Sequence, residues 1–176
     1  MARKWSGDDR GAALVELAFA LPLLLMLLVG MVSAGVAYNN QLALTHSARE
    51  GGRYAATLPV TNFGSMDDWL EEVINQAVND ATGTLAAGVP GRSVCVAYVH
   101  PAGVAASDQT ASRILDNSGL QPTQSGQQCF SDGRPDNERR VQVVVGRDID
   151  FSVVFWSTTL NLDAEGVNRF EAALGT

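Results

Sequence analysis

The sequence has little positive charge. It carries 12 Lys and Arg residues against 19 Asp and Glu residues, which gives a formal net charge of −7 at pH 7. A surface that binds nucleic acid must be basic, because it has to neutralise phosphates. The composition therefore argues against nucleic acid as a partner.

Signatures of catalysis are also missing. No G-x-S-x-G, H-E-x-x-H or P-loop pattern occurs. The two histidines, His46 and His100, have no partner nearby in the sequence that suggests a catalytic relay, and we interpret both as surface residues. The acidic segment 132–138 offers carboxylates for calcium, but its spacing matches no EF-hand loop, so a solvated turn is the favoured interpretation. We expect no enzymatic activity, no cofactor and no metal site.

Charge of either sign is absent from residues 17–37. These 21 residues are mostly aliphatic, and as a helix they span roughly 30 Å, the thickness of a bilayer core. Basic residues precede the run and do not reappear until Arg49, so the positive-inside rule places the N-terminus in the cytoplasm and the C-terminal bulk outside. The run predicts a single-pass membrane protein. Release by an ordinary signal peptidase near Ser33–Ala37 is the less favoured alternative, because the run exceeds the length of a cleaved signal.

Helical periodicity continues beyond the membrane run, up to Leu58 and Pro59, and predicts one helix of about 45 residues. Small residues form one face of its outer half: Ala48, Gly51, Gly52 and Ala55. Such a face allows another helix to approach closely, or it packs against the chain's own domain. The sequence leaves both interpretations open.

The remaining residues predict a small α+β domain. Ser65 and Asp68 have capping-box spacing at the start of a helix with an apolar stripe, and Gly83 is a plausible end. The stripe consists of Trp69, Leu70, Val73, Ala77 and Ala81. Strands of a small antiparallel sheet are expected at 93–99, at 140–147 with an extension to 156, and at 160–167. Gly146 predicts a bulge or bend, and residues 101–138 read as a loop with a short helix near Ser112–Asp116.

Only two cysteines are present, Cys95 and Cys129. Outside the cytoplasm two cysteines most simply form a disulfide, and the companions that a metal-binding or reactive thiol pair needs are absent. We therefore predict that they pair.

The stretch RGAALVELAFA carries the most specific signal. A short polar leader ends at Gly11, and Ala12-Ala13-Leu14-Val15-Glu16 leads into the membrane run. This resembles a class III signal peptide, which a prepilin peptidase cuts after the glycine, so that a glutamate becomes the fifth mature residue. The following residues, and the A-R-E-G-G-R-Y-A-A segment at 48–56, resemble the TadE family of minor pilins from tight-adherence (Flp) pilus systems.

The resemblance implies four parts of the chain: a leader (1–11), a transmembrane helix (12–38), its extracytoplasmic extension (39–58) and an exported α+β domain (59–176). It implies processing between Gly11 and Ala12, and partners that include the prepilin peptidase, other pilins, the inner-membrane assembly platform and membrane lipid. Ala12 stands where type II pseudopilins and ordinary type IV pilins usually have an aromatic residue or Met. The long outer domain points to a minor rather than a major subunit, and a TadF-type protein remains an alternative.

Glu16 poses an energetic problem, because a carboxylate in a membrane helix costs about 2.5 kcal/mol or more. After cleavage the new α-ammonium of Ala12 would be an opposite charge close by, and pairing within one chain or between neighbouring chains would compensate both. We therefore assign Glu16 to docking between subunits. In the competing interpretation, Glu16 snorkels to the interface of an unprocessed, membrane-anchored binding module that never enters a filament.

Overall fold

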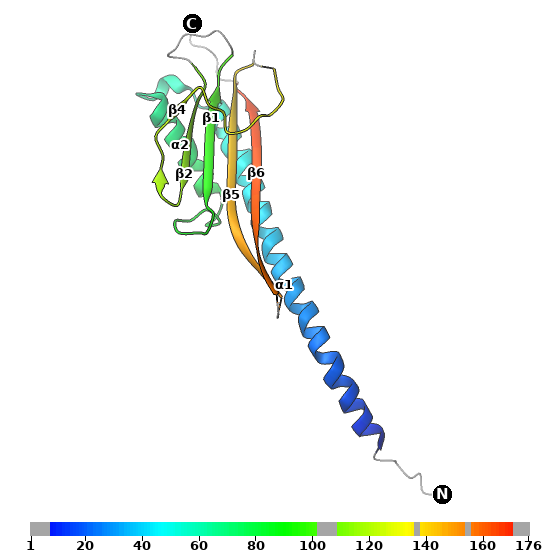
Figure 1. Cartoon of the computed structure of the whole chain (residues 1–176). Helices are drawn as coiled ribbons and strands as arrows, with labels where there is room; N and C mark the ends of the chain where they lie inside the picture. The colour runs from blue at the N-terminus through cyan, green and yellow to red at the C-terminus, as the bar shows by residue number, and fades with distance from the viewer. Residues whose placement is uncertain (1–7, 102–108, 136–137, 154–155, 171–176) are drawn as a thin grey trace, which may run out of the picture.

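The structure, a computed structural model, describes residues 8–101, 109–135, 138–153 and 156–170. A long helix, α1 (Asp8–Thr57), leaves the α+β domain and projects well beyond it (Figure 1). Within the domain, α1 and a second helix, α2 (Met66–Asp80), cover one face of a six-stranded sheet. The α+β fold predicted from the sequence is confirmed.

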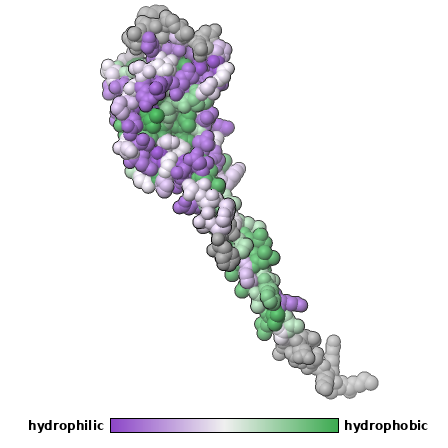
Figure 2. Space-filling view, viewed as in Figure 1, coloured by the Kyte–Doolittle hydropathy of each residue, from purple (hydrophilic) through white to green (hydrophobic). Residues whose placement is uncertain are grey.

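The α1 helix is continuous for 50 residues, somewhat longer than the predicted 45. Pro22 lies inside it, within the apolar run, where membrane helices tolerate proline. The apolar side chains of this part are exposed: Phe19, for example, has 82% of its surface accessible. Figure 2 shows them as a hydrophobic stalk below a domain that is mostly hydrophilic. One helix, within Gly11–Thr57, is thus long and apolar enough to span a membrane, and it fits a single-pass anchor.

The α2 helix begins where the sequence predicts. The Ser65 hydroxyl accepts a hydrogen bond from the Asp68 backbone N–H (3.2 Å) and donates one to the Asp68 carboxylate (2.8 Å). All five residues of the predicted apolar stripe are fully buried. Trp69 donates a hydrogen bond from its indole Nε1 to the carbonyl of Leu58 (3.1 Å), which ties α2 to the end of α1 across a short 3-10 turn, η1 (Val60–Asn62). Its ring also packs edge-on against Tyr98.

The sheet has more strands than the sequence predicts. They are β1 (Ser93–Val99), β2 (Ala111–Asp116), β3 (Gly119–Leu120), β4 (Gln124–Ser125), β5 (Arg140–Val153) and β6 (Trp156–Arg169). The order is β3-β2-β1-β5-β6, β4 also pairs with β2, and all pairs are antiparallel. The predicted short helix at Ser112–Asp116 is wrong: these residues form β2, because they pair with Val94–Ala97 of β1.

The β5–β6 hairpin is the longest feature of the sheet. Its register is unbroken from Arg140 opposite Arg169 to Val153 opposite Trp156, so Gly146 marks no bulge. Gly146 instead lies at a crowded crossing, where an added Cβ would come within 3.0 Å of the Ser93 hydroxyl. Beyond Gly146, β5 pairs with β6 alone, and this two-stranded part runs down beside α1 (Figure 1).

The disulfide between Cys95 and Cys129 is confirmed. It joins β1 to the loop before β5. Gln142 of β5, which is fully buried, binds the backbone of the same loop. Its side chain accepts a hydrogen bond from the Cys129 N–H (3.1 Å) and donates one to the Phe130 carbonyl (3.0 Å). The disulfide and the hydrogen bonds of Gln142 together hold the loop on the sheet.

Replacing both Cys95 and Cys129 with serine is expected to lower the free energy of unfolding of the exported domain by about 3–4 kcal/mol. The reason is the 34-residue separation of the two cysteines, since the bridge restricts a loop of that length in the unfolded chain. Urea unfolding of the full chain in micelles, followed by the change in tryptophan fluorescence as buried Trp69 becomes exposed, measures the change. Reduction of the wild-type chain serves as control and should shift the midpoint equally, whereas an unchanged midpoint in the double variant would contradict the prediction.

Candidate processing and assembly site

The predicted processing junction lies on the exposed foot of α1. Gly11, Ala12 and Glu16 are all helical and exposed. Ala12 and Glu16 are four residues apart, so they lie on the same side of the helix, about 6 Å apart along its axis. Most of the predicted leader, residues 1–7, lies outside the described residues. A new amine at Ala12 would therefore start one helical turn below the Glu16 carboxylate.

The small-residue face of α1 packs within the chain. Ala48 and Ala55 are fully buried, and Gly51 and Gly52 are buried with them. At Gly51 an added Cβ would lie 3.1 Å from the Cβ of Ala77 in α2. Of the two interpretations left open by the sequence, the structure therefore places this face against the chain's own domain.

The sheet approaches α1 closely at Gly166 of β6. A Cβ added there would collide with the backbone carbonyl of Ala48, and backbone cannot move aside as the end of a flexible side chain can. Ser47 strengthens the same region by donating a buried hydrogen bond from its hydroxyl to the Ala77 carbonyl (2.6 Å). The upper half of α1, around residues 41–57, is thus a structural part of the domain, whereas the lower half, within the apolar run, is largely exposed.

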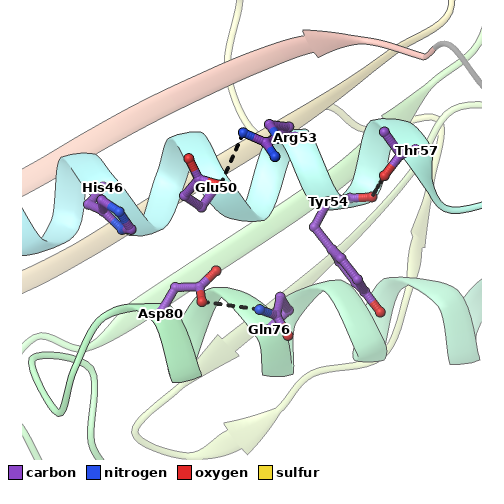
Figure 3. A pocket seen from close by; sticks show the side chains of 7 residues that line it. All are labelled: His46, Glu50, Arg53, Tyr54, Thr57, Gln76 and Asp80. Carbon is purple, nitrogen blue, oxygen red and sulfur yellow. Dashed lines mark hydrogen bonds and ion pairs between the residues drawn. The ribbon is translucent and has the colours of Figure 1, made fainter.

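A polar groove lies between α1 and α2 (Figure 3). It has a volume of about 440 Å³ and is lined by His46, Glu50, Arg53, Tyr54, Thr57, Gln76 and Asp80. Neighbours on the same helix interact: Glu50 with Arg53 at 3.9 Å, and Gln76 with Asp80 at 3.1 Å. Burial raises the pKa of the Tyr54 phenol, and the charge of Glu72, to which it donates a hydrogen bond (3.4 Å), raises the pKa further. This phenol therefore stays protonated at neutral pH and is no base.

The two histidines, His46 and His100, have different surroundings. His46 is exposed at the groove, whereas His100 follows β1 and packs its ring on Tyr98, with the ring centroids 4.3 Å apart. Glu71 and Glu72, adjacent on α2, also have different partners. Glu71 forms an ion pair with Arg113 (3.2 Å), and Glu72 accepts the hydrogen bond from Tyr54. Among the described residues, no group of three or more His, Cys, Asp or Glu side chains could hold a metal ion.

The sequence missed a buried ion pair at the far end of the sheet. Asp132, assigned to a solvated turn or a calcium loop, instead receives two hydrogen bonds from the Arg140 guanidinium, from Nε (2.6 Å) and Nη2 (3.0 Å). Gln142 donates a third bond (3.0 Å), and both charged side chains are almost fully buried. Burial alone would raise the pKa of Asp132, but the hydrogen bonds from Arg140, Gln142 and the Arg134 N–H, with the charge of Arg140, lower it overall. The signal was present in the alternation of Arg140, Val141, Gln142 and Val143, which puts two polar residues on one face of a strand.

Comparison with known proteins singles out the same N-terminal stretch. Residues 11–53 match the model of the TadE-like protein family, so the match covers about a quarter of the chain. It begins at Gly11 and contains Glu16, the apolar part of α1 and the small-residue positions up to Gly52. No curated protein and no solved structure matches the chain. The resemblance predicted from the sequence is confirmed, and it supports association with components of a tight-adherence pilus.

Proposed function

We propose that this TadE-like chain is a minor pilin or pseudopilin that takes part in assembling a tight-adherence (Flp) type IV pilus, and thereby in surface attachment. A prepilin peptidase removes residues 1–11, and α1 then holds the subunit in the cytoplasmic membrane. The N-terminus faces the cytoplasm and the disulfide-bearing domain lies outside. The subunit is structural, without catalytic activity of its own.

One observation carries this proposal: the upper half of α1 is buried against the domain, and the lower half is exposed. Its upper half is committed to the domain through buried Leu44, Ala48 and Ala55, while the half from Gly11 to Val32 exposes apolar side chains around a single carboxylate, Glu16. A simple membrane anchor needs no carboxylate there and loses stability by having one. A subunit that docks through its membrane helix uses the charge, because a paired buried charge sets register between helices.

The partners of this function are other pilins and the inner-membrane assembly platform, with lipid around α1 before assembly. We assign no partner to the polar groove between α1 and α2. If the subunit stays in the membrane as an unprocessed binding module, the same α1 would serve only as an anchor, and the two functions differ in the mature N-terminus.

Intact-mass analysis of the membrane-purified protein tests the processing step. In a host with a prepilin peptidase, the mass is expected to fall by that of residues 1–11, so that the chain begins at Ala12. The same host without the peptidase, and a Gly11→Val variant in the complete host, should both give the full-length mass. A wild-type chain that still carries Met1–Gly11 beside an active peptidase would overturn the proposed processing.

A further inference from the structure

The lower end of the β5–β6 hairpin reaches the membrane part of α1. The Ser33 hydroxyl donates a hydrogen bond to the backbone carbonyl of Ser152 (3.0 Å), although the two residues are 119 positions apart. Ser33 lies inside the charge-free run, four residues before its outer end at Ala37. Four residues of helix correspond to about 6 Å, so the hairpin descends to a level below the outer end of the apolar run.

The chemistry of the hairpin end suits that level. No charged side chain occurs between Phe151 and Leu162. Trp156 exposes 61% of its surface, although its ring packs edge-on near Phe151 with the centroids 6.4 Å apart. An exposed tryptophan beside a second aromatic ring is costly in water, but it is typical of proteins at the boundary between lipid headgroups and acyl chains.

Charged groups begin just above this end. The Asp150 carboxylate accepts a hydrogen bond from the Thr159 hydroxyl (3.2 Å), and Asp148 accepts one from Asn161 (2.6 Å). On α1, the first exposed aromatic residue after the apolar run is Tyr38. The hairpin therefore gains its first charges near the level at which α1 leaves its apolar run, as two elements that enter one interface would.

We propose that the end of the β5–β6 hairpin, around Phe151 and Trp156, inserts into the outer leaflet of the membrane that α1 spans. The occupant of this surface is lipid, at the boundary between headgroups and acyl chains. The hairpin is then a second membrane contact, which sets the height and tilt of the domain above the bilayer. The inference requires that α1 spans the membrane, but it holds whether or not residues 1–11 are removed.

The disulfide makes a clean labelling experiment available. Both cysteines of the chain are in the bridge, so a single added cysteine reacts alone under non-reducing conditions. We would place an NBD fluorophore at Ser157→Cys, next to Trp156 and exposed, in the full chain reconstituted into vesicles of phosphatidylcholine and phosphatidylglycerol.

The matched control is Ser125→Cys, an exposed serine at the opposite end of the sheet. Ser125 pairs with Ala111, which pairs with Tyr98, and Tyr98 pairs with Val141 near the start of β5. Ser152 lies near the other end of that strand, about 35 Å away at the usual rise per residue. The control therefore reports on the same domain at a height that lipid does not reach.

The expected result is a blue-shifted NBD emission at position 157, quenched about twofold or more by lipids brominated near the headgroup end of the acyl chains, with no such quenching at position 125. Adding Trp156→Asp to the 157 label should weaken the quenching, because a carboxylate opposes insertion. Equal access of iodide to both labels, without quenching by brominated lipid, would overturn the proposal. Protection of position 157 from both quenchers would also overturn it, since protein rather than lipid would then cover the hairpin. None of these outcomes depends on the mass of the mature chain.

Discussion

Replacing Glu16 with alanine or glutamine is expected to remove nearly all crosslinks between the membrane helix of this chain and other pilins. In the proposed pairing of the processed chain, each replacement leaves the Ala12 ammonium without its partner. Breaking a buried pair by removing one charge costs about 3–5 kcal/mol, which corresponds to a loss of roughly 10²- to 5 × 10³-fold in association. The effect on assembly should therefore be close to complete.

The measurement uses a photoreactive amino acid at Leu25, which is exposed in the middle of the apolar run. Crosslinked species are compared in whole cells that contain the complete pilus system. Glu165→Gln is the matched control, because Glu165 is an exposed glutamate on β6, beyond the outer end of the apolar run and far from Glu16. Equal membrane levels and equal leader removal show that the Glu16 variants are otherwise intact. Crosslinking that persists at the wild-type level in both Glu16 variants would contradict the docking role.

Replacing Asp132 with alanine is expected to destabilise the exported domain by about 3–5 kcal/mol, the largest effect on folding that we predict for one side chain. The replacement leaves the Arg140 guanidinium buried, with only the carbonyls of Pro135 and Glu138 still accepting from its Nη1. Urea unfolding of the full chain in micelles, followed by tryptophan fluorescence as before, gives the value. Glu165→Ala, at an exposed acidic position, should stay within about 0.5 kcal/mol of the wild type.

A double replacement, Asp132→Leu with Arg140→Met, separates the charge from the packing. Removing both charges avoids an unpaired ion, so the double variant should be more stable than Asp132→Ala alone. If instead the double variant is the less stable of the two, the lost contacts of both side chains, rather than an unpaired charge, dominate. That result would contradict our explanation.

The same ion pair gives the domain a defined dependence on pH. The folded state lowers the pKa of Asp132, so folding favours the ionised carboxylate. The stabilisation is complete above the ordinary pKa of an aspartate side chain and is lost as the pH falls through the lower pKa of the folded state. The unfolding midpoint of the wild type should thus fall on acidification through this range, and the contribution of this pair to that fall should be missing in Asp132→Ala.

Features encoded by neighbouring residues could be predicted from the sequence. The start of α2 depends on Ser65 and Asp68, three positions apart, and β1 depends on one β-branched run. By contrast, β2 depends on pairing with β1 across an intervening polar segment, and its residues, Ala111–Asp116, have no strand-like alternation of their own. Secondary structure that arises from long-range pairing is not visible in a short window of sequence.

The candidate site divides in the same way. Gly11, Ala12 and Glu16 form a local motif, and for that reason the sequence alone identified them. The Asp132–Arg140 pair is buried in the folded domain, where the disulfide and Gln142 hold the loop on the sheet, so charge in the sequence wrongly suggested solvent exposure. The descent of the hairpin to Ser33 is likewise a property of two elements that meet only in the folded chain.

The continuity of α1 has a mechanical consequence. A continuous helix of 50 residues is about 75 Å long, and it carries a displacement at one end to the other, although Pro22 removes one hydrogen bond in its lower part. Hydrogen bonds to the hairpin and the adjoining β6 are spaced along it at Ser33, Asn40 and Gln41. An axial pull at the foot of the helix loads these bonds side by side in shear, so they share the force instead of opening one after another. Extraction from the bilayer would accordingly move α1, the hairpin and the domain together as one body.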